Sequence, residues 1–242
     1  WIDENYLSHF EKIEVDSEVR LQKPFAERKE EYGFYSVTEG EDTEGKAYFS
    51  YNTVCGDGLD RNLYRAFPVL SYVLVQSIGA PLKQALLDAG IGNDISCYYE
   101  ESVRQPFFSI IAKNVKMEQK QQFINVIETE LKKIVKEGLN QQSLLAAING
   151  YEFQYREADF GNFPKGLMYG LQIFDSWLYD DKAPFMHIEA NETFDALKKL
   201  VQTDYFEQLV ENQILNNTHK SIVSLLPEKG MESRESEKLK EM

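Results

Sequence analysis

The sequence predicts an α+β domain with a mixed, largely antiparallel sheet and helices packed on one face of that sheet. Two observations favour this class. The expected elements run strand, strand, helix, helix, strand, strand, several helices and a final strand, an order in which helices mass against one sheet face. Residues 63–78 are apolar so far round a helix that we expect this helix to be buried between layers.

The composition supports a sizeable core and an acidic surface. Of 242 residues, 43% are hydrophobic and 13% aromatic, so disorder over most of the chain is not expected. Lys and Arg total 26 against 40 Asp and Glu, which gives a net charge of −14. This balance argues against nucleic acid as a partner, because affinity for nucleic acid depends on cations that neutralise phosphates. An acidic surface would instead attract cationic peptides.

The first quarter of the chain is expected to supply one helix and the first strands. Apolar residues at spacings of four, four and three predict an amphipathic helix over residues 2–13. Alternation predicts a strand within residues 15–25, and Pro24 places its end near a sheet edge. An extended piece over residues 32–37 and a strand over residues 46–54 follow.

The buried helix follows a glycine turn at residues 55–58. Asp57 or Asp60 can cap its N-terminus, and Pro68 can kink it about two turns inside. Its apolar face is expected to consist of Leu63, Phe67, Leu70, Leu74 and Ile78.

The stretch 76–115 is the part around which the rest of the chain is organised. We expect a helix to close at residues 77–79, a short helix over 82–89, a glycine turn at 90–92, and strands over 94–100 and 106–114. This stretch carries no obvious reaction chemistry. A sheet edge beside a glycine turn could instead hold another peptide.

The remainder is mostly helical. Helices are expected over residues 117–138, 141–159, 165–179, 194–201 and 205–215, and a closing strand over 219–226. The last stretch is charged and nearly free of apolar residues, which predicts a linker running into another helix. Because the chain opens on Trp1 without Met and stops inside that pattern, we expect it to be part of a longer protein. No apolar run approaches the ~20 residues that a membrane-spanning helix needs, so no membrane partner is expected.

No residue pattern predicts catalysis by this chain. Its histidines, His9, His187 and His219, have no second His or Cys within four residues, so the paired ligands of a zinc-protease helix are absent. We expect His187 on a solvent-facing loop. Cys55 and Cys97 suit a reducing compartment and lack basic neighbours that would activate a thiol; whether the two lie close together stays open. Carboxylate pairs are plentiful in so acidic a chain and identify no shared pocket. No catalytic or metal-binding residue is assigned.

Two stretches carry a family resemblance. Residues 151–185 read YEFQYREADFGNFPKGLMYGLQIFDSWLYDDKAPF, and residues 78–94 read IGAPLKQALLDAGIGND. They resemble the pitrilysin/insulinase zinc metallopeptidases, and most closely the bacterial presequence-protease branch. The resemblance covers nearly the whole chain in order. It implies a LuxS/metallohydrolase-like domain, one of four homologous domains that close in two halves around an unfolded peptide.

The resemblance also implies a place within such an enzyme. The chain is similar to the second, non-catalytic domain of the N-terminal half, which follows the zinc-bearing catalytic domain. Residues 1–14 would be a linker helix from that catalytic domain, 15–227 a single α/β domain, and 228–242 the start of a helical hairpin linker. Zinc is therefore expected in the parent protein, whereas this chain would hold no cofactor.

Members of the family hold the N-terminal part of a substrate at an exosite in this domain, by adding a strand to a sheet edge. The matching positions here are Ser77, Ile78 and Gly79 on the turn, and Asp94, Ile95, Ser96 and Cys97 on the strand. Pairing through the backbone tolerates many sequences, which suits an enzyme that degrades many peptides. The alternative is that residues 94–99 form an interior strand with both edges occupied.

The resemblance and the residues together predict a non-catalytic chamber-wall domain of a bacterial, cytoplasmic zinc metalloendopeptidase. Its partners would be unfolded peptides, cationic ones included, and other domains of the same parent chain. One alternative is a structural interaction module from an inactive relative. A second is a free-standing hydrolase that uses Cys97 or a carboxylate pair.

Overall fold

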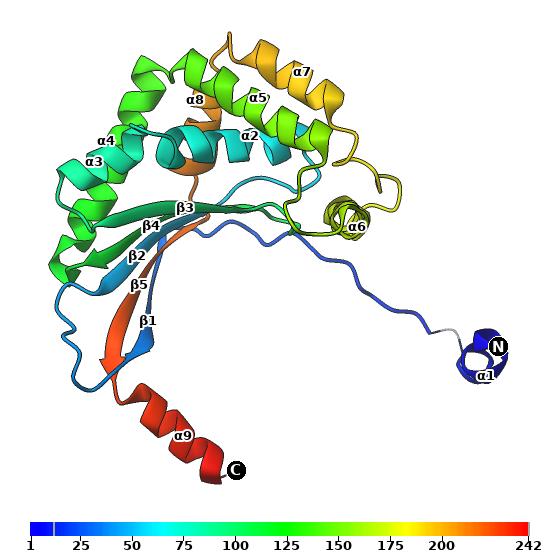
Figure 1. Cartoon of the computed structure of the whole chain (residues 1–242), viewed down its shortest axis with the longest axis horizontal. Coiled ribbons are helices and arrows are strands. Elements are labelled where there is room, and N and C mark those ends of the chain that lie inside the picture. Colours follow the sequence, from blue (N-terminus) through cyan, green and yellow to red (C-terminus); the bar gives the residue numbers. More distant parts are fainter. Residues whose placement is uncertain (12, 242) are drawn as a thin grey trace.

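Five strands form one sheet in the computed structural model, which describes residues 1–11 and 13–241. The strands are β1 (Lys29–Val37), β2 (Ala47–Val54), β3 (Asp94–Glu100), β4 (Phe107–Val115) and β5 (Lys220–Lys229). Their order across the sheet is β1-β5-β2-β4-β3, so β1 and β3 lie at the two edges (Figure 1). Only β1 and β5 pair in parallel; the other three pairings are antiparallel. The predicted mixed, largely antiparallel sheet is confirmed.

One face of this sheet is covered by a layer of helices (Figure 1). These are α2 (Arg61–Ser71), α3 (Pro81–Asp88), α4 (Lys120–Glu137), α5 (Gln141–Glu157), α7 (Asn191–Leu200) and α8 (Tyr205–Leu209). Helix α6 (Lys165–Trp177) lies beyond the end of the sheet, α1 (Ile2–Asn5) lies apart from it at the N-terminus, and α9 (Met231–Glu241) extends away from the end of β5 (Figure 1). Short 3-10 turns lie at Leu7–His9 and Met117–Gln119, and π-helical turns extend α2 over Tyr72–Gln76 and α8 over Val210–Leu215. The α+β class with helices on one face is therefore confirmed.

The core lies between the sheet and the helices because strand residues alternate between the two faces. Along β2, Ala47, Phe49 and Tyr51 are buried toward the helices, as their spacing predicted. Phe49 meets Phe123 of α4 with ring centroids 5.7 Å apart. Phe67 of α2 packs over the other half of the sheet.

The α2 helix begins as predicted and ends earlier. Asp60 caps it, since its Oδ1 accepts from the backbone N–H groups of Asn62 and Leu63 at 2.9 and 3.0 Å. The helix then widens into the π-helical turn at Tyr72–Gln76. Ile78 lies beyond that turn and is fully exposed, so its predicted place on the buried face is wrong. The apolar periodicity of the sequence extends to Ile78, about one turn beyond the point where the helix ends.

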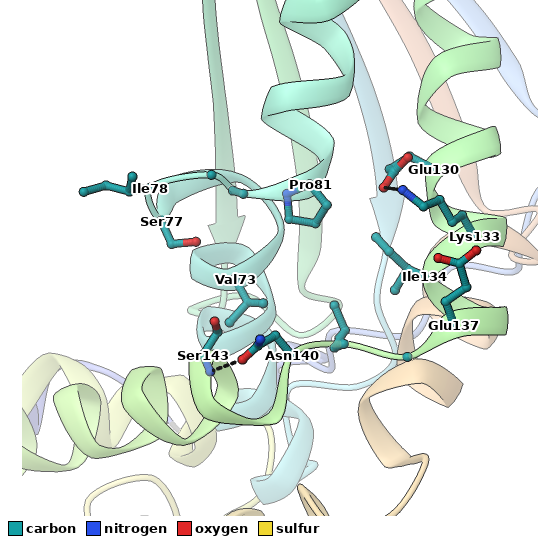
Figure 2. Close-up of a pocket in the computed structure, with 14 residues that line it drawn as sticks. Val73, Ser77, Ile78, Pro81, Glu130, Lys133, Ile134, Glu137, Asn140 and Ser143 are labelled. Carbon is teal, nitrogen blue, oxygen red and sulfur yellow. Dashed lines mark hydrogen bonds and ion pairs between the residues drawn. The ribbon is translucent and has the colours of Figure 1, made fainter.

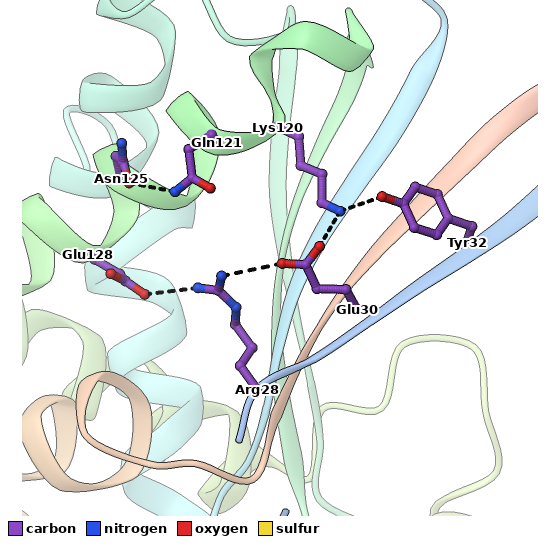
Figure 3. Close-up of polar contacts among 7 residues, drawn as sticks. All are labelled: Arg28, Glu30, Tyr32, Lys120, Gln121, Asn125 and Glu128. Atoms are coloured by element: carbon purple, nitrogen blue, oxygen red, sulfur yellow. Dashed lines mark hydrogen bonds and ion pairs between the residues drawn. The ribbon is translucent and has the colours of Figure 1, made fainter. Parts of the chain in front are cut away.

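A polar network joins the β1 edge of the sheet to the helix layer (Figure 3). Lys120 at the start of α4 donates to Glu30 Oε2 at 2.6 Å and to the Tyr32 hydroxyl at 2.8 Å. Arg28, just before β1, lies 3.4 Å from Glu30 and 3.5 Å from Glu128 of α4. The positive charges lower the pKa of the Glu30 carboxyl, with the Lys120 hydrogen bond as the largest cause.

Two N-terminal predictions are wrong. Residues 13–25 contain no strand, and the alternating side chains Val19 and Leu21 lie exposed in an extended segment. The predicted helix over residues 2–13 is reduced to α1 and one 3-10 turn, with exposed apolar side chains. Alternation and periodicity specify an element only where a core face is available to bury it.

The division of the chain into residues 1–14, 15–227 and 228–242 stays a prediction. Its outer segments contain Lys12 and Met242, which lie outside the described residues. β5 runs to Lys229, and α9 follows directly after Gly230.

Candidate functional site: the β3 edge and the Ser77–Gly79 turn

The predicted peptide site begins with β3, which lies at an edge of the sheet. Among the described strands only β4 pairs with β3, so the interior position that was the alternative is wrong. An edge strand presents unpaired backbone N–H and C=O groups, to which another extended chain can pair. The structure therefore offers what strand addition requires.

The outward backbone groups can be assigned to particular residues. The Cys55 N–H donates to the Pro106 carbonyl at 2.6 Å, which fixes the bonded pairs between β2 and β4. Because bonded pairs alternate along an antiparallel ladder, every second residue of β4 bonds to β3 instead. Through the β3–β4 register, the N–H and C=O groups of Ile95, Cys97 and Tyr99 are those that point away from β4.

The side chains of β3 alternate across that edge. Ile95 and Tyr99 are buried against the helices, and Tyr99 stacks on Phe67 with ring centroids 5.0 Å apart. On the opposite face Tyr98 is half-exposed, and at the start of the strand Asp94 lies 3.2 Å from Lys113 Nζ of β4. The buried side chains hold the strand rigidly while its outer backbone stays open.

The Ser77–Gly79 turn lies beside β3 because the end of the α2 extension packs on that strand. The Gln76 side-chain amide donates to the Cys97 sulfur at 3.5 Å, and the Cys97 thiol donates to the Ser71 carbonyl at 3.5 Å. Gly79 has φ = +72°, a conformation that favours glycine, and it turns the chain into α3. The two halves of the predicted site, separated by more than a dozen residues in sequence, are therefore brought together.

A pocket of about 340 Å³ lies on the other side of this turn (Figure 2). Val73 and the turn form one wall, and the C-terminal half of α4 forms the other. Ile78 reaches outward from the turn, away from α4. Sequence reasoning missed the α4 wall, which contributes Glu130, Lys133 and Glu137.

The pocket has a negative rim. Glu130 pairs with Lys133 at 3.3 Å, while Glu137 adds a second carboxylate at the last residue of α4. The carbonyl ends of a helix carry partial negative charge, which favours cations at its C-terminus. An ammonium or guanidinium group would therefore find a favourable environment here.

Neither thiol is set up as a nucleophile. Burial raises the pKa of Cys97, and Gln76 and Ser71 supply only neutral contacts. Burial also raises the pKa of Cys55, which is fully enclosed. Both are free cysteines with separate contacts. The geometry gives no support to a hydrolase that uses Cys97.

The histidines are equally unsuited to metal. Within the described part of the chain, no three His, Cys, Asp or Glu side chains are grouped so that they could hold an ion. His9 lies on the exposed N-terminal turn and His219 packs on Phe25, so the residues present do not fit a catalytic zinc.

No helix in the described part of the chain is both long and apolar enough to cross a bilayer.

The predicted solvent-facing position of His187 is wrong. The side chain is only 2% exposed and stacks on Tyr64, with ring centroids 3.7 Å apart. Its carbonyl accepts a hydrogen bond from Arg65 at 2.6 Å. Burial, followed by the positive charge of Arg65, lowers the pKa of His187 to about 4. A packing role for the ring could not be read from its loop position.

A family profile, described as the peptidase M16 inactive domain, matches residues 1–151 of the chain. The chain belongs to the peptidase M16 inactive-domain family. The resemblance to the pitrilysin/insulinase family is thereby confirmed, whereas the place of this M16 domain within a longer enzyme stays a prediction.

Two relatives of this M16 domain are much longer than it is. It is 42% identical to protein HypA of Clostridium perfringens over 240 residues, covering 99% of this chain and 25% of HypA. It is 30% identical to presequence protease 1 of Arabidopsis thaliana over 231 residues, covering 92% of this chain and 21% of that protease. The chain thus spans about a quarter or less of the length of these relatives.

Solved structures share the fold at low sequence identity. The inactive peptidase domain of a candidate zinc protease from Bordetella parapertussis has a TM-score of 0.58 at 8% identity, over 77% of this chain and 94% of that one. A protease from Helicobacter pylori has a TM-score of 0.56 at 14% identity, over 91% of this chain and 51% of that one. These likenesses show the M16 fold of this chain and do not by themselves assign a ligand.

Proposed function

We propose that this M16 domain anchors unfolded peptides for a zinc-dependent metalloendopeptidase of which it forms a non-catalytic chamber wall. A peptide would add a strand along β3, and a neighbouring side chain would enter the pocket behind the Ser77–Gly79 turn. The zinc and the catalytic residues would come from another domain of the same parent protein. We further propose a bacterial, cytoplasmic setting, like the one expected from the sequence.

The observation that carries this proposal is the open edge of β3. Its outward backbone groups at Ile95, Cys97 and Tyr99 lie on a strand whose side chains are fixed in the core. Main-chain pairing supplies affinity without requiring a particular sequence, and side-chain pockets beside the strand supply preference. The exposed Ile78 and the pocket provide two such side-chain contacts.

The charge of the site supports a preference for cationic peptides. Glu130 and Glu137 line the pocket together with Lys133, which pairs with Glu130, so Glu137 supplies the excess negative charge there, and the whole chain carries a net charge of −14. Attraction between exposed charges is screened by salt over about 10 Å at 0.1 M, so this preference should weaken as the salt concentration rises.

Backbone N-methylation of the peptide tests strand addition directly. In a set of labelled unfolded peptides, each methylated at one amide, we expect binding to this chain to weaken at alternate positions. Each methyl group that faces β3 removes a hydrogen bond worth about 1 kcal/mol and adds a clash, so a loss of about tenfold or more is expected there. Methyl groups that face away should change the Kd by less than about twofold. A Kd that does not alternate along the peptide refutes strand addition.

A matched pair of variants tests the turn. Ile78→Ala removes an exposed apolar side chain beside β3, whereas Leu87→Ala removes one from α3, outside the site. We expect the first to weaken peptide binding several-fold and the second to leave the Kd unchanged. Equal effects would place the peptide elsewhere.

Zinc content and cleavage separate this role from a free-standing hydrolase. We expect the isolated chain to contain no stoichiometric zinc, to bind peptide equally with and without a chelator, and to leave the peptide intact. The complete parent polypeptide should cleave the peptide and lose that activity on chelation. Chelator-resistant cleavage by the isolated chain would favour the hydrolase instead.

A further inference from the structure

The face of the sheet opposite the helix layer, which we call the open face, also borders the β3 edge (Figure 1). On β3 this face carries Asp94, Ser96, Tyr98 and Glu100, which alternate with the side chains that point toward the helices. A peptide added along β3 would likewise turn every second side chain toward the open face. The Ser77–Gly79 turn and its pocket lie on the helix side, so they contact only the other half of those side chains.

The two ends of this strip differ in charge. At one end Asp94 is compensated by Lys113, which lies opposite it on β4 with its Nζ 3.2 Å from the carboxylate. At the other end Glu100 has no ion-pair partner among residues 1–11 and 13–241. Its carboxylate accepts instead from the Tyr98 hydroxyl, the Ser102 hydroxyl and, at 3.0 Å, the Ser102 N–H. Although burial alone would raise it, these hydrogen bonds lower the pKa of Glu100, so the group stays negative.

Tyr98 places an aromatic surface beside that uncompensated carboxylate. Its side chain is 50% exposed, and its ring lies 6.1 Å from the ring of Phe107 on β4. The hydrogen bond from its hydroxyl to Glu100 keeps the ring and the carboxylate together. A cation over the face of a tyrosine ring is attracted by the π electrons. A guanidinium or ammonium group at this end of the strip would therefore meet both a ring and a negative charge.

The geometry of strand pairing brings one peptide side chain to this place. Side chains directly opposite each other on neighbouring strands have Cβ atoms about 4.5–5.5 Å apart, and diagonal neighbours are about 7–8 Å apart. The peptide side chain opposite Tyr98 thus has the ring beside it and Glu100 as a diagonal neighbour, within reach of the long stem of Arg or Lys. Asp94 lies four residues from Tyr98, roughly 13 Å along the strand, and is out of reach.

We propose that Tyr98 and Glu100 form a specificity subsite, which takes an Arg or Lys side chain at the peptide position opposite Tyr98. The inference rests on the proposed strand addition at β3 and concerns the face of the peptide that the pocket does not contact. Because the subsite and the pocket lie on opposite faces of the added strand, a peptide that fills both carries two basic residues at an odd spacing. The net charge of the chain alone would favour no such spacing.

The test compares two labelled peptides that differ only in one residue, arginine or citrulline, since citrulline keeps the shape of arginine without its charge. From the usual strengths of a cation–π contact and an exposed ion pair, we expect the arginine peptide to bind wild type about fivefold more tightly or better. Glu100→Gln keeps an acceptor for Tyr98 and Ser102, and it should lower this ratio of Kd values at least threefold. Asp94→Asn removes an equal charge from the same face of the same strand and should leave the ratio within twofold of wild type.

Two Tyr98 variants test the ring. Tyr98→Phe keeps the aromatic face and should retain most of the preference for arginine, whereas Tyr98→Leu should lower it to the level of Glu100→Gln. A ratio in Tyr98→Leu equal to that of wild type would overturn the assignment of this subsite.

Other outcomes separate this inference from the proposed function. Equal decreases in Glu100→Gln and Asp94→Asn would reflect the net charge and overturn the inference. A ratio that falls only in Glu137→Gln would assign the cation to the pocket alone, which also overturns it. In both cases the citrulline peptide still binds with the alternating effect of N-methylation, so the proposed anchoring stands. If neither peptide binds, the anchoring is refuted and the inference with it.

Discussion

Replacement of His187 by phenylalanine should remove a specific part of the pH dependence of stability. In the folded chain the imidazole is buried against Tyr64, and its pKa lies at about 4, below its ordinary value of 6.5. Because the unfolded chain binds the proton more tightly, this group favours folding fully above pH 6.5, and its contribution is lost as the pH falls toward 4. The difference between the two pKa values is worth about 3 kcal/mol in total, and about 2 kcal/mol between pH 7 and pH 5.

Urea unfolding at a series of pH values measures this effect. The half-buried carboxyls Glu101 and Asp175 have pKa values that burial raises, so they add a pH dependence of their own, and the informative quantity is the difference between wild type and variant. We expect the wild type to lose about 2 kcal/mol more than His187→Phe between pH 7 and pH 5, and His9→Phe to follow the wild type. Phenylalanine keeps the stacking on Tyr64 but cannot take up a proton. Parallel curves for wild type and His187→Phe would refute the reasoning.

Three further predictions concern the free energy of unfolding. Gly92→Ala should destabilise the fold by about 2–3 kcal/mol, because the φ of Gly92 is +64° and the added Cβ would lie 2.6 Å from the Lys113 carbonyl oxygen. Gly90→Ala is the control: its φ is +68° but no atom lies within 4 Å of the added Cβ, so it should cost only about 1 kcal/mol, and equal losses for the two variants in urea unfolding would contradict this account. Asp60→Ala should lower the free energy of unfolding by about 1 kcal/mol, because the α2 cap is lost. Asp60→Asn should keep most of the stabilisation, because the asparagine side-chain oxygen can accept the same hydrogen bonds. Lys120→Met should cost less than about 1 kcal/mol and raise the pKa of the nearby Glu30 carboxyl in an NMR titration; an unchanged pKa would show that the ion pair does not form in solution.

The elements predicted correctly from the sequence are those whose apolar side chains have a core in which to be buried. The alternating apolar side chains of β2 and the periodic ones of α4 both face that core, and both elements form where they were expected. Residues 15–25 alternate equally well and form no strand: Val19 and Leu21 lie exposed, and Phe25 at the end of the stretch packs on His219. Local pattern cannot distinguish these cases, since burial is a property of the whole chain.

The candidate site was predictable in part for a related reason. The glycine turn and the strand over residues 94–100 were both recognisable along the sequence, whereas the edge position of that strand was open against an interior one. The structure places the turn and the strand side by side through Gln76 and Cys97. The wall that α4 contributes was missed, because Glu130 and Glu137 follow an ordinary solvent-facing helical pattern. A helix over residues 165–179 was expected from its periodicity, but that pattern did not indicate that Leu167, Leu171 and Phe174 would lie exposed.

The position of β5 has a consequence for synthesis. This last strand lies between β1 and β2, so β1 has no hydrogen-bonding neighbour in the sheet until β5 has emerged. Residues 38–219 separate the two strands, and at about 5–20 residues per second a ribosome needs roughly 10–40 s to produce them. During that interval the nascent chain presents Tyr32 and Phe34 on an unpaired ribbon, the kind of segment that holdase chaperones bind and that aggregates when translation stalls.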